Sequence, residues 1–120
     1  MIVAAAPRKH PVSAYDAIER HALSLPEATS APHHHFGSFR VRGKIFATVP
    51  PERTHIHVFV PDAQRDEYLE LYPDFCEKLL WGGKVVGLRV ALADADLDVV
   101  RAMLRRAWEA KAPKRLLDEG

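Results

Sequence analysis

The chain has 120 residues, of which 48% are hydrophobic and 28% are charged. This length and composition are typical of one globular domain, and they exclude a second domain of ordinary size and a largely disordered chain. The 17 lysines and arginines nearly balance the 16 aspartates and glutamates, so the formal net charge of +1 gives no strong overall field to attract polyanions.

The cellular setting follows from cysteine usage and from the apolar runs. Cys76 is the single cysteine, which excludes an intrachain disulfide and favours a reducing compartment, so we expect a cytoplasmic protein. No run approaches the roughly 20 apolar residues of a transmembrane helix, and we expect no membrane partner. We expect residues 1–12 to be a flexible lead-in, residues 13–117 a single domain and residues 118–120 a tail.

The first half of the chain predicts one helix followed by three strands. Apolar residues at three- and four-residue steps predict a helix over 14–24, which ends at a Leu-Pro pair. Apolar and polar side chains then alternate along three short segments, as they do in half-buried strands. These segments, near 34–42, 45–49 and 54–60, predict an antiparallel meander.

The second half predicts a short helix, a hairpin and a longer helix. The hairpin consists of strands over 75–81 and 84–92 that Gly82-Gly83 joins, and it follows a helix over 62–72. Asp94 or Asp96 can cap the last helix, which runs to the break at Pro113. This order predicts an α+β sandwich of two layers, with an antiparallel sheet of about five strands and the N- and C-terminal helices packed on one face.

Three segments carry a resemblance to a known family. They are Gly43-Lys44-Ile45-Phe46-Ala47 after an arginine-rich strand, Ser24-Leu25-Pro26-Glu27 upstream of it, and residues 107–116 near the end of the chain. In their order and spacing they resemble the MmcQ/YjbR family of small bacterial proteins, over about residues 15–117. The resemblance implies a frataxin/CyaY-like fold and DNA binding of a double-wing type. The run His33-His34-His35 departs from the polar residues that the family often has there.

Four predicted strands place basic and aromatic side chains on the sheet face opposite the helices. We expect the core face to carry Ile45, Ala47, Val49, Ile56, Val58 and Val60. We expect the other face and its turns to carry Arg40, Arg42, Lys44, Phe46, Thr48, His55, His57, Phe59, Lys84 and Arg89. Cations there can bind phosphates while exposed rings stack on unpaired bases. The alternative is that Phe46 and Phe59 lie in a second small core or at a dimer interface, and a register slip of one residue would exchange the two faces.

The C-terminal segment concentrates positive charge, whereas the stretch 61–80 is acidic. Lys114 and Arg115 follow the last predicted helix, where cations offset the negative end of the helix dipole without any partner. Alternatively, they anchor the protein to the nucleic-acid backbone, which gives affinity but no sequence choice.

Metal binding and catalysis have weaker signals. His55 and His57 have a spacing that can chelate a transition metal, but no further ligand motif accompanies them. Cys76 has no base at a recognisable spacing, so a small buried side chain explains it better than a nucleophile does. We therefore expect no metal, no cofactor and no enzymatic activity.

The sequence thus favours a non-enzymatic DNA-binding protein that is a monomer or a weak homodimer. The alternative is a ligand-binding or protein-interaction module of the same fold without nucleic-acid binding. A third hypothesis takes iron handling from the frataxin resemblance, with the acidic stretch 62–77 as the candidate ridge. Apolar residues interrupt that stretch at helical spacing, so a solvated helix face is the simpler explanation.

Overall fold

The protein is described from a computed structural model, and the description covers residues 12–117. The predicted lead-in and tail fall almost entirely outside this range. The elements are α1 (Val12–Ser24), β1 (Ala28–His33), β2 (Phe36–Val41), β3 (Lys44–Val49), β4 (His55–Val58), α2 (Asp62–Leu71), β5 (Cys76–Trp81), β6 (Lys84–Ala91), α3 (Leu97–Lys111) and α4 (Lys114–Leu117).

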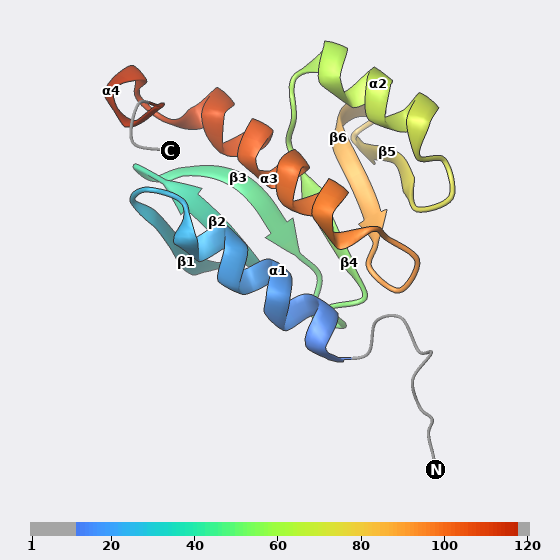
Figure 1. Ribbon diagram of the computed structural model, residues 1–120, viewed down its shortest axis with the longest axis horizontal. Coiled ribbons are helices and arrows are strands. Elements are labelled where there is room, and N and C mark those ends of the chain that lie inside the picture. Colours follow the sequence, from blue (N-terminus) through green and yellow to red (C-terminus); the bar gives the residue numbers. More distant parts are fainter. Residues whose placement is uncertain (1–11, 118–120) are drawn as a thin grey trace.

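One six-stranded sheet, with the order β1-β2-β3-β4-β6-β5, forms the centre of the molecule, and all neighbouring strands are antiparallel. Helices α1 and α3 lie side by side over the sheet, and α2 covers its β5–β6 end (Figure 1). The predicted α+β class with an antiparallel sheet is confirmed. Within residues 12–117, no helix has both the length and the apolar character to cross a bilayer.

The predicted count of about five strands is wrong because the sequence gives no signal for β1. Its residues Ala-Thr-Ser-Ala-Pro-His lack alternating apolar side chains, and all six are exposed or half-buried. The strand lies at the edge of the sheet, where Pro32 is tolerated because one side needs no hydrogen-bond donor. This segment is therefore a strand because it pairs with β2 along its whole length, and not because of its own composition.

Helix α3 provides the centre of the core. Its apolar stripe at three- and four-residue steps is fully buried and consists of Val100, Met103, Leu104, Ala107 and Trp108. The side chain of Asp96 caps the helix by accepting from the backbone N–H of Asp98 at 3.0 Å, which decides between the two predicted caps. Trp108 Nε1 donates to the carbonyl of Pro26 at 3.0 Å, so α3 is tied to the connection between α1 and β1.

A β-bulge in β3 reverses the predicted orientation of two side chains. Phe39 is opposite Ala47, but the next residue, Arg40, is opposite Ile45, so Phe46 is an extra residue on its strand. Phe46 is fully buried beside Phe39, with 6.4 Å between the ring centroids, whereas Ile45 is only half-buried. The prediction that Phe46 is exposed and Ile45 lies in the core is therefore wrong.

Two hairpin turns lie at the same end of the sheet. In the β2–β3 turn, Arg42 and Gly43 have φ values of 54° and 80°, and in the β5–β6 turn Gly82 and Gly83 have 60° and 80°. Positive φ at both central residues is typical of the type I′ turns that suit twisted hairpins. The glycine turn is as predicted, but Arg42 lies in a turn and not on the strand face. Since all neighbouring strands are antiparallel, β3 and β6 both start at this end, where α3 also ends.

The burial of Phe46 gives a stability prediction. Phe46→Ala should lower the free energy of unfolding by about 3–5 kcal/mol, because it removes a fully buried ring and leaves a cavity. Urea unfolding measures this loss, and Ile45→Ala, at the half-buried neighbour, should have a smaller effect. A loss below about 1 kcal/mol for Phe46→Ala would mean that the ring lies outside the core.

Candidate functional site

The structure separates the residues predicted to contact nucleic acid into two groups. One group lies at the end of the sheet with the two hairpin turns, which we call the turn end, and comprises Arg42, Lys44, Lys84, Lys114 and Arg115. The other lies on strands at the sheet face that points away from the helices, which we call the open face, and comprises Arg40, His55, His57 and Arg89. Phe46 belongs to neither group because it is in the core.

Lateral strand pairing defines the open face. Thr48 pairs with His57, His57 with Arg89, and Arg89 with Glu77, so these side chains project from the same side of the sheet. The neighbouring register line, from Ala47 through Val58 to Leu88, consists of core residues under the helices. The prediction that His57 and Arg89 share one face is therefore confirmed.

The cations of the open face already have partners. An Nη atom of Arg89 lies 2.7 Å from a carboxylate oxygen of Glu77. Arg40 donates from Nε to Ser38 Oγ at 3.0 Å and from Nη2 to the Pro32 carbonyl at 3.3 Å. Burial, together with the nearby Arg89 guanidinium, lowers the pKa of His57 to about 4, so this imidazole is neutral at pH 7. The open face therefore has less free positive charge than the strand pattern predicts.

Aromatic rings take up much of the open face. The His57 ring lies between those of Phe36 and Trp81, with centroid distances of 5.8 and 6.3 Å, and Phe59 contacts Trp81 at 5.4 Å. Trp81 is 43% exposed. The sequence analysis did not select Trp81. Its position directly before the Gly-Gly turn could have indicated its face, because a two-residue turn fixes the register of both strands. The open face is thus largely apolar.

At the turn end, one carboxylate lies between two arginines from distant parts of the chain. Glu27 forms an ion pair with Arg42 in the β2–β3 turn, and its other oxygen lies 3.8 Å from Arg115 in α4. The two arginine side chains are 45% and 60% exposed. The sequence gives no signal for this grouping, yet here Glu27 holds two guanidinium groups close together at the surface.

Further lysines lie at the same end of the sheet. Lys44 follows the β2–β3 turn and Lys114 begins α4, both exposed, and Lys84 follows the second turn. Lys111, near the end of α3, is half-buried and lines a cavity of about 350 Å³ together with Trp81. The cavity therefore connects the turn end with the open face. The six cations of the turn end are Arg42, Lys44, Lys84, Lys111, Lys114 and Arg115.

Elsewhere, arginines and carboxylates pair on the same helix. Arg101 contacts Asp98, and Glu109 is shared by two arginines, Arg105 and Arg106. On α2, Arg65 contacts Asp62 and Asp66, so the acidic stretch carries its own counter-charge. Each of these pairings joins residues of one helix, whereas Glu27 at the turn end joins arginines from distant parts of the chain.

The remaining chemical candidates form no active centre in the described residues. No three His, Cys, Asp or Glu side chains of residues 12–117 lie close enough to hold a metal ion. His55 Nδ1 lies 3.0 Å from the hydroxyl of Thr54, and His57 Nδ1 lies 3.3 Å from that of Thr48. Cys76 is buried, and burial raises the pKa of its thiol to about 11, so it stays protonated at neutral pH.

Comparison with known proteins identifies the family. The YjbR family model matches residues 23–110, from the last turn of α1 to the end of α3. The chain belongs to the YjbR family. The predicted resemblance is therefore confirmed. A search of curated proteins gives no match to this YjbR protein.

A solved structure supports the fold of this YjbR protein. The crystal structure of the Deinococcus radiodurans protein DR2400, which carries the family-model domain DUF419, superposes with a TM-score of 0.65. The two chains are 14% identical, and the match covers 78% of this chain and 74% of that one. At this identity the likeness shows the fold alone. The turn end and the open face of this YjbR protein must be argued from its own residues.

The lowered pKa of His57 predicts how stability depends on pH. The unfolded chain binds a proton at His57 below about pH 6.5, whereas the folded protein does so only near pH 4, so stability falls as the pH falls through this range. The loss between pH 7.5 and pH 5.0 should be about 1–2 kcal/mol larger in the wild type than in His57→Gln.

Urea unfolding at the two pH values tests this expectation. His21 and His55 also have lowered pKa values and act in the same direction, so the comparison with the His57 variant isolates one residue. Equal losses in both proteins would mean that His57 titrates normally in the folded state.

Proposed function

We propose that this YjbR protein binds DNA phosphates through the turn end. The observation that carries the proposal is the Glu27 group, in which one carboxylate holds Arg42 and Arg115 together while both guanidinium groups remain about half exposed. Guanidinium groups fixed in this way lose little side-chain freedom when each binds a phosphate with two parallel hydrogen bonds. Neighbouring lysines extend the positive region at both turns.

The two hairpin turns give this end a shape that suits a duplex. Each projects past the last hydrogen-bonded pair of β4, and each is followed directly by a lysine, Lys44 in one case and Lys84 in the other. Two such projections can track the backbone on both sides of a groove, and this arrangement supports a double-wing mode of binding on a CyaY-like fold. Backbone contacts of this kind give affinity without sequence choice.

The charges at the turn end limit the expected affinity. The six cations of the turn end, two of them paired with Glu27, predict about four to five phosphate contacts, and the low net charge adds little long-range attraction. We therefore propose moderate, strongly salt-dependent binding by a monomer or weak dimer in the cytoplasm, with no enzymatic activity.

Fluorescence anisotropy with labelled duplex and single-stranded DNA from about 20 to 200 mM salt tests the proposal. The log–log salt slope for duplex should be about −4 in the wild type. The variant R42A/K44A/K114A/R115A should bind about 10–100-fold more weakly at 50 mM salt, with a flatter slope, because it loses up to four contacts.

A matched variant controls for net charge. R20A/R65A/K78A/R101A also removes four cations, but from α1, α2, β5 and α3, outside the turn end. Its affinity should stay within about threefold of the wild type. Equal loss of affinity in both variants would mean that binding depends on the overall charge and not on the turn end. No binding by the wild type at 20 mM salt would contradict the proposal.

The open face supports a second candidate function, the binding of another protein or a second copy of this chain. Trp81 is 43% exposed and lies against the rings of His57 and Phe59, and large apolar side chains clustered at a surface are typical of interaction sites. This surface lies beside the turn end, so both functions can coexist.

Sedimentation equilibrium tests for self-association through this surface. If the open face forms a homodimer, Trp81→Ala should weaken dimerisation at least tenfold, because truncation of a buried interface tryptophan often removes 2 kcal/mol or more. Leu71→Ala, at a 58% exposed residue on α2, serves as the control. A wild type that stays monomeric at about 100 μM would exclude the homodimer.

A further inference from the structure

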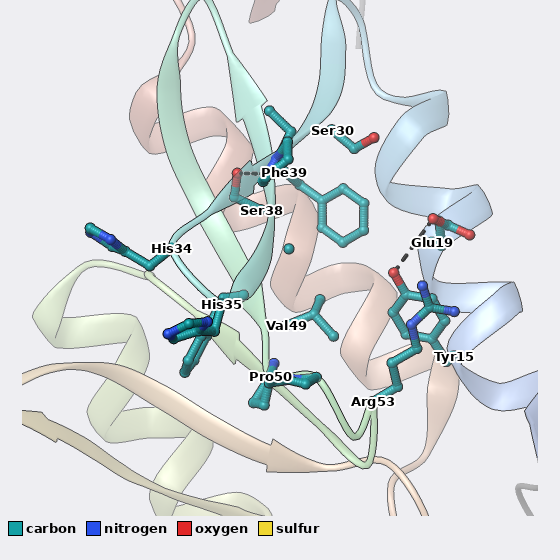
Figure 2. A pocket seen from close by; sticks show the side chains of 15 residues that line it. Tyr15, Glu19, Ser30, His34, His35, Ser38, Phe39, Val49, Pro50 and Arg53 are labelled. Carbon is teal, nitrogen blue, oxygen red and sulfur yellow. Dashed lines mark hydrogen bonds between the residues drawn. The ribbon is translucent and has the colours of Figure 1, made fainter.

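A cleft of about 480 Å³ lies at the opposite end of the sheet from the two hairpin turns. Helix α1, the β1–β2 hairpin and the loop after β3 form its walls (Figure 2). This volume is within the range of small-molecule sites. None of the cations of the turn end lines it.

Opposite charges lie beside the same ring in this cleft. The Arg53 guanidinium lies over the Tyr15 ring, 4.7 Å from its centroid, and the Tyr15 hydroxyl donates to Glu19 Oε2 at 3.4 Å. Figure 2 shows both charged side chains next to Tyr15, on the side of the cleft formed by α1 and the loop. In the described part of the chain, no carboxylate comes within 4.0 Å of the Arg53 guanidinium. Each charge is therefore available to a ligand.

The backbone fixes Arg53 in this position. Its N–H donates to the Pro50 carbonyl at 2.9 Å, which closes a turn. Its φ of 59° lies in the left-handed region, where a non-glycine residue has a conformational cost of about 1 kcal/mol. The turn thus places the guanidinium over Tyr15 although the local backbone is unfavourable.

The floor of the cleft is apolar and has a gap, whereas the β1–β2 hairpin adds the polar residues Ser30, His34, His35 and Ser38 to the lining. Phe39 and Val49 line the cleft, yet they are only 2% and 3% exposed, so they form a packed floor. Gly37 is paired with Val49 and also lines the cleft. A Cβ atom at Gly37 would have its nearest neighbour at 4.0 Å, so the space above the floor exists because residue 37 has no side chain.

We propose that this cleft binds a small zwitterion with an apolar side chain, of the α-amino acid class. The ligand carboxylate pairs with Arg53, its ammonium group with Glu19, and its side chain packs on Phe39 and Val49. A simple anion would meet Glu19 without compensation, and a simple cation would meet Arg53. Only a ligand with both charges satisfies both groups at once.

Isothermal titration calorimetry with L-leucine and L-phenylalanine, each up to about 10 mM, tests the proposal. The probes that remove one charge are 4-methylpentanoate, which lacks the ammonium group, and isoamylamine, which lacks the carboxylate. We expect saturable binding of at least one amino acid, and at least tenfold weaker binding of both single-charge analogues.

Three variants locate the binding. Arg53→Gln and Glu19→Gln should each weaken it at least tenfold, and Gly37→Leu should abolish it because the new side chain fills the gap over the floor. Arg20→Gln, on the exposed side of α1, is the control and should bind as the wild type does. Melting temperatures of the free variants check that each is folded.

No saturable binding of either amino acid by the wild type overturns the proposal. So does binding that Gly37→Leu leaves unchanged in a folded protein, because that ligand would lie elsewhere. Equal affinity for leucine and 4-methylpentanoate overturns the role of Glu19. All these outcomes are independent of DNA binding at the other end of the sheet.

Discussion

The hydrogen bond from Trp108 Nε1 to the Pro26 carbonyl is the contact on which the arrangement of the turn end depends. Trp108 is fully buried in the apolar stripe of α3, so its indole N–H needs a partner in the protein interior. The partner carbonyl belongs to the residue directly before Glu27. The core thereby fixes the position of Glu27, and Glu27 in turn holds Arg42 and Arg115 together. A contact within the hydrophobic core thus determines where two exposed cations lie.

The molecule separates its charge from its apolar surface. On the open face, Glu77 neutralises Arg89 and burial keeps His57 uncharged, so aromatic rings dominate there. At the turn end, cations outnumber the carboxylate that organises them, which favours a polyanion over a neutral partner. A net charge of +1 is compatible with such a site, because phosphate binding depends on local contacts more than on the total charge.

The sequence predicted most of the fold because periodicity reports burial directly. The three longer helices, the Gly82-Gly83 hairpin and the antiparallel sheet all have strong local patterns. It could not predict β1, which is a strand because it pairs with β2 at the edge of the sheet. Nor could it predict the bulge at Phe46, which exchanges the faces of Ile45 and Phe46 and has no signal in the local sequence. The predicted position of the candidate site also differs from the observed one, because strand alternation does not show where a turn begins. Sheet alternation placed Arg42 on a strand face, whereas the structure places it in a turn beside Glu27.

The most direct test of the turn end as a DNA site maps the contact itself. Backbone amide chemical shifts, recorded while a short DNA duplex is added at low salt, report which residues meet the nucleic acid. We predict the largest changes at residues 42–44, 82–84 and 111–117, and small changes at His55, His57 and Arg89 on the open face. Changes centred on the open face, with the turn end unaffected, would contradict this account.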